Sequence, residues 1–158
     1  MQRITPFLWY DGKAEEAIHL YTSVFKNSKL IDIAYWEEGG PFPKGQVRSS
    51  TFELDGLRLH AFDAGPMFKF TEAVSFFVPC DTQEEIDHYW EKLTAGGGQE
   101  SMCGWLKDKF GLSWQIVPSG LDKMFGEKDR TKAGRAMQAM MKMKKFIIAD
   151  LHKAFDGE

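Results

Sequence analysis

Two short apolar segments carry polar side chains at alternate positions, and these polar residues are the ones best suited to chemistry. The segments are GLRLHAF (56–62) and GLSWQIV (111–117). Successive side chains of a strand point to opposite faces. One face therefore carries Arg58, His60 and Phe62 in the first segment and Ser113 and Gln115 in the second. A guanidinium can pair with an anionic group, and an imidazole or amide can hydrogen-bond a carbonyl or hydroxyl. The two faces thus suit a small ligand with one or two polar groups.

The elements that must position these side chains occur twice along the chain. AEEAIHLY (14–21) and QEEIDHYW (83–90) align through His19 and His88, at an offset of 69 residues. The strands before them, ITPFLWY and AVSFFVP, follow the same offset, whereas GLRLHAF and GLSWQIV align at an offset of 55. We assign the difference to a loop insertion at EEGGPFPKGQ (37–46), which is rich in Gly and Pro. The alternative is that two amphipathic helices resemble each other by chance, but a repeat that includes the closing strands favours duplicated units.

The alternation also predicts which strand faces lie beneath the helices. In the closing strands these are the wholly apolar faces, Leu57, Leu59 and Ala61 with Leu112, Trp114 and Ile116. In the opening strands the offset of 69 places Phe7, Trp9, Phe76 and Val78 beneath the helix and leaves Pro6, Leu8, Ser75 and Phe77 on the open side. Asp81 and Thr82 are the N-cap candidates for the second helix.

These patterns predict an α+β protein of a single domain. Two tandem β-α-β-β-β modules, residues 1–68 and 72–119, form a cupped mixed sheet, and residues 120–158 add a C-terminal helical extension. In the extension, apolar residues recur at helical spacing opposite three lysines, which predicts one amphipathic helix of about six turns. The apolar set is Met137, Met140, Met141, Ile148, Leu151 and Phe155, and the lysines are Lys142, Lys145 and Lys153. Its stripe predicts core or subunit packing and a homodimer; a membrane or partner-peptide surface is the alternative.

A sheet with an apolar back and a polar, aromatic front predicts a cup for a small ligand with an aromatic or apolar body. The candidate ligand-binding residues are Arg58, His60, Phe62, Ser75, Phe77, Trp105, Ser113 and Gln115. The alternative is that this front face simply meets solvent or a subunit partner, because one-sided antiparallel sheets have the same pattern.

Composition narrows the classes of partner. The chain has 158 residues, of which 43% are hydrophobic and 27% charged, with a net charge of −3. This balance argues against nucleic acid and anionic membrane surfaces as partners. No apolar run approaches the roughly 20 residues of a membrane span, and the start lacks a secretory pattern, so we expect a cytoplasmic protein. Cys80 and Cys103 fit neither a disulfide framework nor a zinc motif and are expected to be reduced thiols.

Four segments carry a family resemblance that covers nearly the whole chain. They are PFLWYDGKAEEAIHLYTSVF, EAVSFFVPCDTQEEIDHYWEKLTAGG, CGWLKDKFGLSWQIVP and AMQAMMKMKKFIIADLHKAF. They resemble the PhnB-like family, often labelled 3-demethylubiquinone-9 3-methyltransferase, of the vicinal oxygen chelate superfamily. That superfamily includes glyoxalases, bleomycin-resistance proteins and dioxygenases. The resemblance implies paired β-α-β-β-β modules and a small-molecule site.

The resemblance also implies where a metal would bind. Metal enzymes of the superfamily carry their ligands on the first and last strands of each module, which here correspond to Pro6, His60, Ser75 and Gln115. Of these four, only His60 and Gln115 have side chains suited to ligate a divalent transition metal. A catalytic zinc site normally uses three protein ligands. We therefore predict no cofactor and an incomplete metal site. The alternatives are a metal-dependent lyase, isomerase or dioxygenase that uses His60 and Gln115, and a 3-demethylubiquinone methyltransferase. No glycine-rich turn follows the first strand to hold S-adenosylmethionine; the GGG at 96–98 follows a helix instead.

Overall fold

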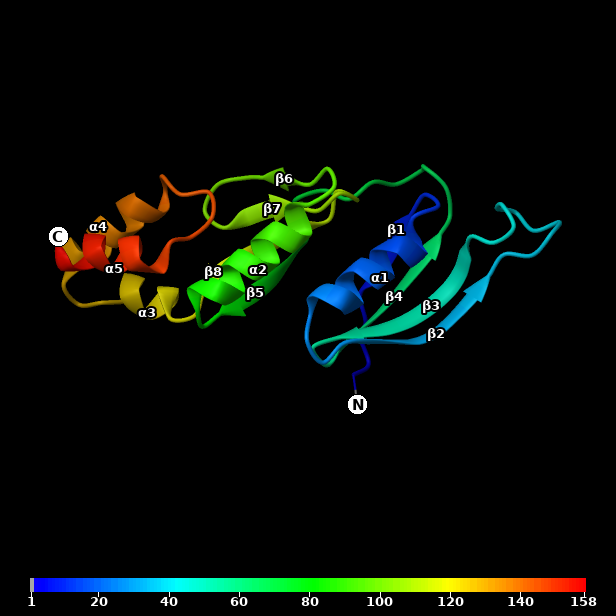
Figure 1. Ribbon diagram of the computed structural model, residues 1–158, viewed down its shortest axis with the longest axis horizontal. Helices are drawn as coiled ribbons and strands as arrows, with labels where there is room; N and C mark the ends of the chain where they lie inside the picture. The colour runs from blue at the N-terminus through cyan, green and yellow to red at the C-terminus, as the bar shows by residue number, and fades with distance from the viewer. Residues whose placement is uncertain (1) are drawn as a thin grey trace. The chain divides into compact units, whose positions relative to one another are not determined.

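A helix packed on a four-stranded mixed sheet forms in each half of the chain, as the repeat predicts. The computed structural model describes residues 2–158. It contains two compact units, of which unit 1 ends at Phe70 and unit 2 begins at Thr71. In both units the elements follow the order β-α-β-β-β, and three further helices end unit 2 (Figure 1).

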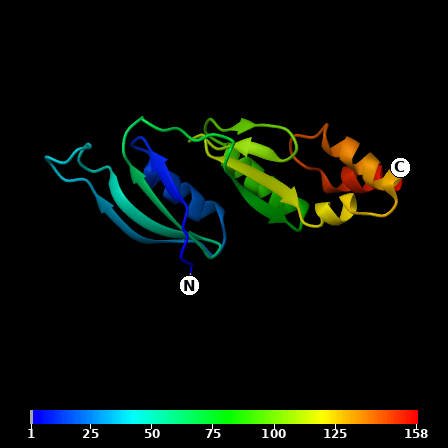
Figure 2. The same ribbon diagram turned by 180° about the vertical axis from the view of Figure 1, so that it is seen from behind.

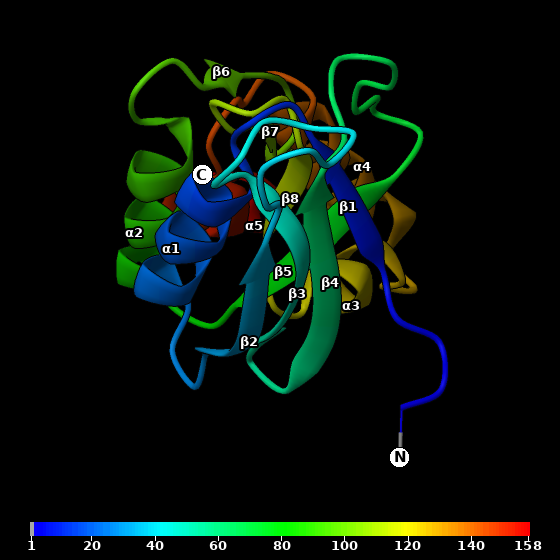
Figure 3. The same ribbon diagram turned by 90° about the vertical axis from the view of Figure 1, so that its right-hand side faces the viewer.

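Unit 1 has its opening and closing strands side by side. Its elements are β1 (Phe7–Tyr10), α1 (Ala14–Val24), β2 (Lys29–Tyr35), β3 (Val47–Leu54) and β4 (Leu57–Asp63). The strand order is β1-β4-β3-β2, in which β1 and β4 are parallel and the other pairs antiparallel (Figure 3). Segment 37–46 lies in the connection between β2 and β3. β2 is an edge strand, and its pairing with β3 shifts register between Leu30 and Asp32 and again between Ala34 and Tyr35.

The prediction for the faces of β1 is wrong. Leu8 and Tyr10 are buried, whereas Phe7 is 58% exposed. Leu8 pairs with Ala61, so it shares the apolar face beneath α1, and Phe7 pairs with His60 on the open face. The cause is a turn: three residues separate β1 from α1, but only two separate the corresponding elements of unit 2. The strands therefore repeat at an offset one residue larger than the helices, and a shift of one residue moves every side chain to the opposite face.

Asp63, the last residue of β4, substitutes for an N-cap on α1. Lys13 occupies the N-cap position and makes no side-chain capping bond. The buried Asp63 carboxylate accepts hydrogen bonds from the Lys13 and Ala14 amides through Oδ1, at 2.8 and 3.0 Å, and from the Val47 amide through Oδ2, at 2.9 Å. An anionic acceptor also suits the positive end of the helix dipole. One carboxylate thus joins β4 to the starts of α1 and β3.

Unit 2 repeats this plan with shorter middle strands. Its elements are β5 (Ser75–Cys80), α2 (Gln83–Thr94), β6 (Gln99–Glu100), β7 (Trp105–Lys107) and β8 (Ser113–Pro118), in the sheet order β5-β8-β7-β6. Seen from behind, β8 lies in front of α2 (Figure 2). Ile86, Trp90 and Leu93 of α2 are buried, as are Leu106, Trp114 and Ile116 of the sheet. The predicted cap is confirmed, because the Thr82 hydroxyl accepts from the Glu85 amide at 3.2 Å.

The extension contains three short helices, so the prediction of one long helix is wrong. They are α3 (Leu121–Phe125), α4 (Arg130–Met140) and α5 (Ile148–Asp156). Ala133 and Ala136 are the buried residues of α4, whereas Met137 and Met141 are 41% and 62% exposed. Met137 and Met141 of the predicted apolar set therefore do not pack in the core, whereas Leu151 of the same set is buried. Arg135 donates from Nε to the Ala154 carbonyl and from Nη2 to the Phe155 carbonyl, which holds α4 against the end of α5.

The connection between α4 and α5, which we call the strap (residues 141–147), binds the body of unit 2. The Cys103 and Gly104 amides donate to the Met143 and Lys144 carbonyls at 2.8 Å each. Phe146 is 1% exposed. A Cβ added at Gly104 would lie 2.5 Å from the Phe146 ring, so glycine is required where the ring packs on the backbone.

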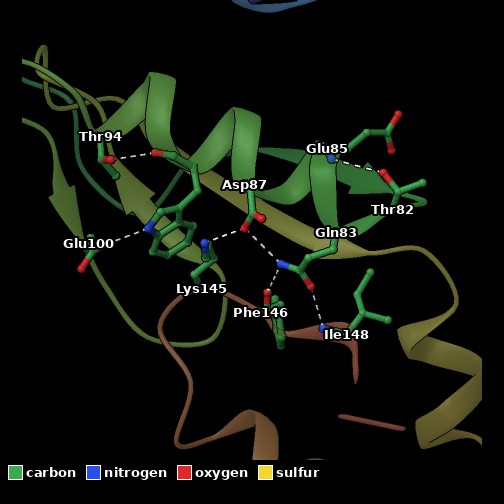
Figure 4. Close-up of polar contacts among 10 residues, drawn as sticks. Thr82, Gln83, Glu85, Asp87, Thr94, Glu100, Lys145, Phe146 and Ile148 are labelled. Atoms are coloured by element: carbon green, nitrogen blue, oxygen red, sulfur yellow. Dashed lines mark hydrogen bonds and ion pairs between the residues drawn. The ribbon is translucent and has the colours of Figure 1, made fainter. Parts of the chain in front are cut away.

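A side-chain network on α2 completes this attachment. Gln83 donates from Nε2 to the Phe146 carbonyl at 3.0 Å and accepts from the Ile148 amide through Oε1 at 2.9 Å. Lys145 pairs with Asp87, to which Gln83 also donates (Figure 4). These contacts lower the pKa of Asp87, first through the Lys145 hydrogen bond and then through that of Gln83.

Among residues 2–158, no helix combines the length and the apolarity that crossing a bilayer requires.

Candidate functional site

The open face of unit 1 is a row of aromatic side chains beside one histidine. Phe7 lies 4.9 Å from Phe62 and 5.8 Å from His60, measured between ring centroids. Trp9 lies 5.0 Å from Phe62 and 4.9 Å from Phe68. The edge-on contacts hold the rings in fixed orientations. Phe62 and His60 are therefore brought together as predicted, and Phe7 and Trp9 join them because of the corrected β1 register.

His60 is held by its Nδ1 atom. Nδ1 lies 3.0 Å from the Ser50 carbonyl oxygen and 3.2 Å from Thr51 Oγ1. A carbonyl can only accept, so the bond to Ser50 requires the proton on Nδ1. With the proton on Nδ1, the neutral form of the ring presents Nε2 as an acceptor. No described residue hydrogen-bonds Nε2, so it can receive a proton donor from a ligand.

Arg58 lies on the same face but has an acidic partner within unit 1. Its Nη2 atom is 3.1 Å from Glu53 Oε1. The Arg58 hydrogen bond is the main reason that the pKa of Glu53 is lowered, with Lys29 adding to the effect. A ligand anion would have to compete with Glu53 for this guanidinium.

The open face of unit 2 has a corresponding arrangement. Phe77 is 58% exposed and pairs with Gln115, which also pairs with Trp105 on its other side. Gln115 donates from Nε2 to Ser75 Oγ at 2.9 Å. Ser75, Phe77, Trp105 and Gln115 therefore share one face, as predicted. A hollow of about 220 Å³ beside Phe77 leads toward the start of α3.

A larger cavity, of about 400 Å³, lies at the other end of this face. Its lining includes Glu72, Met102, Trp105, Lys107 and Ser113. Glu72 and Lys107 are not among the residues predicted from the sequence. Lys107 could have been found, because it follows Trp105 by two residues and therefore lies on the same face of a strand. Its ammonium pairs with the Glu72 carboxylate, and this hydrogen bond is the largest cause of the lowered pKa of Glu72.

Ser113 is buried, whereas we predicted that its face of the strand would be wetter. It has no exposed surface, and its Oγ atom makes no hydrogen bond in the described part of the chain. A buried hydroxyl without a partner costs about 1–3 kcal/mol.

Within residues 2–158, no group of three or more His, Cys, Asp or Glu side chains is arranged to hold a metal ion. Two buried carboxylates serve the fold: Asp63 binds backbone amides, and Asp108 accepts from the Leu112 amide and from the Trp114 indole. His60 belongs to unit 1 and Gln115 to unit 2. The imidazole and amide are compatible with a metal, but they supply fewer ligands than a catalytic site normally uses.

Comparison with known proteins identifies the family. Residues 2–117 match the model of the 3-demethylubiquinone-9 3-methyltransferase family. The chain belongs to this family. The PhnB protein from Bacillus cereus, a proposed 3-demethylubiquinone-9 3-methyltransferase, is 40% identical, with a TM-score of 0.71 over 75% of this chain and 100% of that one. The PhnB-like resemblance is thereby confirmed. No curated protein matches the chain significantly.

More distant structures support the fold of this PhnB-like chain. The protein PA1353 from Pseudomonas aeruginosa is 20% identical, with a TM-score of 0.63 over 75% of this chain and 98% of that one. A mutant of the fosfomycin resistance protein FosX from Listeria monocytogenes, in complex with Mn(II) and 1S,2S-dihydroxypropylphosphonic acid, is 14% identical. Its TM-score is 0.55 over 78% of this chain and 98% of that one. The fold is thus of the vicinal oxygen chelate type. The family match ends at residue 117, so the strap and helices α3 to α5 lie beyond it.

Proposed function

We propose that this PhnB-like protein binds a small molecule with an aromatic or apolar body and one or two polar groups, on the open faces of its sheets and without a complete catalytic metal site. Superfamily membership supports small-molecule binding in general. The ligand contacts we propose are Arg58, His60, Phe62, Ser75, Phe77, Trp105, Ser113 and Gln115, with Phe7 and Trp9 added by the structure.

One repeated arrangement carries this proposal. In each unit an exposed phenylalanine on the opening strand pairs with a hydrogen-bonding side chain on the closing strand: Phe7 with His60, and Phe77 with Gln115. Neither phenylalanine contributes to the core beneath the helix. Contiguous exposed apolar side chains often mark a binding surface, and in unit 1 Phe7 belongs to such a row with Phe62, Trp9 and Phe68. In unit 1, His60 Nε2 would accept from a ligand hydroxyl or N–H, and the rings would pack against the ligand body.

Binding can be tested with a fragment library of aromatic acids, amides and phenols, observed by ligand NMR. Phe7→Ala and His60→Ala should each weaken the binding of hits to unit 1, and Phe77→Ala should do so in unit 2. Leu57→Ala, which removes an exposed apolar side chain from the helix-facing side of β4, is the control and should change nothing. The proposal fails if no fragment binds, or if the control variant weakens binding as much as the others.

Two catalytic alternatives follow from the relatives. A metal-dependent lyase, isomerase or dioxygenase would use His60 and Gln115, and the Mn(II) complex of FosX supports testing it. A methyltransferase is favoured by the family description. Elemental analysis and thermal shift with divalent metals and S-adenosylmethionine distinguish them. One metal per chain, lost in His60→Ala, would replace our proposal with the first alternative. Saturable stabilisation by S-adenosylmethionine would favour the second.

We also propose a cytoplasmic homodimer. The exposed Met137 and Met141 of the extension support a subunit contact. Sedimentation equilibrium tests the dimer, and a monomer at micromolar concentration would contradict it.

A further inference from the structure

We infer that the 400 Å³ cavity of unit 2 binds the carboxylate of a small aromatic acid, with Lys107 and Ser113 as the two donors. This inference rests on the proposed function, since it names a ligand class for one of the proposed surfaces. The cavity volume lies within the ordinary range of small-molecule sites.

The unsatisfied hydroxyl is the first argument. Ser113 lines the cavity, is fully buried, and has no hydrogen-bond partner for Oγ within the described residues. Nearly all buried polar groups in proteins are paired, so an orphan at the wall of a cavity indicates a partner that arrives from outside the chain. That partner has to be an acceptor if the hydroxyl donates.

The position of Lys107 is the second argument. Lys107 and Ser113 are directly paired across β7 and β8, and cross-strand Cβ atoms of such pairs are about 5 Å apart. Both side chains are donors on one face. A carboxylate, with two acceptor oxygens, can receive from both at once.

Glu72 explains how the ammonium can be released to a ligand. It pairs with Lys107, but its own side chain is 61% exposed. Exposed ion pairs contribute little to stability, so a ligand carboxylate can replace Glu72 at small cost. Ser113 has no exposed surface, and displacement of Lys107, its cross-strand neighbour, would open access to it.

The remaining wall suits an aromatic body. Trp105 supplies an indole and Met102 a thioether, both of which pack well on rings. These two residues flank Cys103 and Gly104, whose amides are bound by the strap. The extension therefore positions the apolar wall of the cavity.

The test uses 2-naphthoate and 2-naphthamide, which share a shape and differ in charge, in calorimetric titrations of the full chain. We expect the acid to bind at least tenfold more tightly than the amide. Lys107→Met should abolish that preference, and Ser113→Ala should weaken acid binding about tenfold, the effect of one charge-assisted hydrogen bond. Lys92→Met, an exposed lysine of α2 with the same charge change, should have no effect.

Glu72→Gln provides the most discriminating result. Removal of the competing carboxylate should strengthen acid binding several-fold and leave amide binding unchanged. Ser113→Ala should not lower the melting temperature, because no partner is lost, so weaker binding cannot be attributed to misfolding.

Equal affinities for acid and amide, or undiminished acid binding in Ser113→Ala, would overturn the inference. If both ligands bind equally and Phe77→Ala weakens both, the proposed function stands and only the ligand class is wrong. If neither ligand binds and the fragment library yields no hit, both proposals fail.

Discussion

Replacement of Phe146 by alanine should release the strap from unit 2. The Phe146 side chain is 1% exposed and its ring packs directly on Gly104. Truncation of a buried phenylalanine to alanine costs about 3–5 kcal/mol. The strap has few other anchors: the Gln83 bonds, the Lys145–Asp87 and Lys144–Glu100 ion pairs, and the Cys103 and Gly104 amides. We therefore expect local opening of the strap rather than unfolding of unit 2.

Hydrogen exchange at Cys103 and Gly104 measures this opening. Their amides are protected by the Met143 and Lys144 carbonyls, so exchange should follow release of the strap. A loss of about 4 kcal/mol corresponds to about a thousandfold faster exchange. The His60 amide, bonded to the Pro6 carbonyl in unit 1, should keep its rate and serves as an internal reference. Unchanged protection of Cys103 and Gly104 in Phe146→Ala would refute the packing argument.

Three further changes test the units separately. Asp63→Asn should destabilise unit 1 by about 2–4 kcal/mol in urea unfolding, because the amide group of Asn would face backbone N–H donors that the carboxylate binds in the native chain. Asp11→Asn, at an exposed position, is the control. An equal loss of stability in both variants would contradict the capping role of Asp63. Thr82→Ala should lower the unfolding free energy by about 1 kcal/mol, whereas Thr82→Ser, which keeps the capping hydroxyl, should lose much less. Similar losses in both variants would show that the hydroxyl does not stabilise the helix. Burial raises the pKa of the Cys80 thiol to about 12 from 9.0, with Glu85 and Asp81 adding to the effect. The folded state thus holds this proton more tightly than the unfolded chain, and the unfolding free energy should fall as the pH rises from about 9 to about 12. Cys80→Ala should lose that dependence.

The two repeated modules were predictable because the alternation of the strands and the spacing of apolar residues in the helices are both clear in the sequence. Alternation in GLRLHAF and GLSWQIV identified the closing strands, and the matched helices around His19 and His88 placed the modules. The faces of β1 were not predictable from the helix alignment. The strand FLWY (7–10) consists of large apolar and aromatic residues, so no alternation shows which side is buried. The offset taken from the helices was one residue too small for the strands.

The sequence was sufficient to predict on which strand face the candidate site residues lie, but not how deeply each of them is buried. His60, Phe62, Phe77 and Gln115 lie on open faces as expected, since strand alternation determines this. Ser113 pairs with Lys107 on the neighbouring strand, and Lys107 in turn pairs with Glu72. These contacts join different segments of the chain, so no local pattern shows them. Whether these residues bind a ligand stays a prediction.

The residue types of the extension do not reveal the interruption between α4 and α5. Residues 141–147 contain good helix formers, so the helical pattern appears continuous. Burial of Phe146 and the backbone bonds to Cys103 and Gly104 favour a non-helical path instead. Tertiary contacts of this kind routinely override local propensity.

The register shifts in β2 have a consequence for how the chain behaves during synthesis. The unpaired backbone groups of an exposed edge strand can form hydrogen bonds with a strand of another molecule, which leads to aggregation. Two irregularities within seven residues disturb the spacing of the outward amide and carbonyl groups, and Lys29 and Asp32 add charge along the same strand. A ribosome-bound chain that has completed only unit 1 therefore already carries a safeguard against intermolecular aggregation.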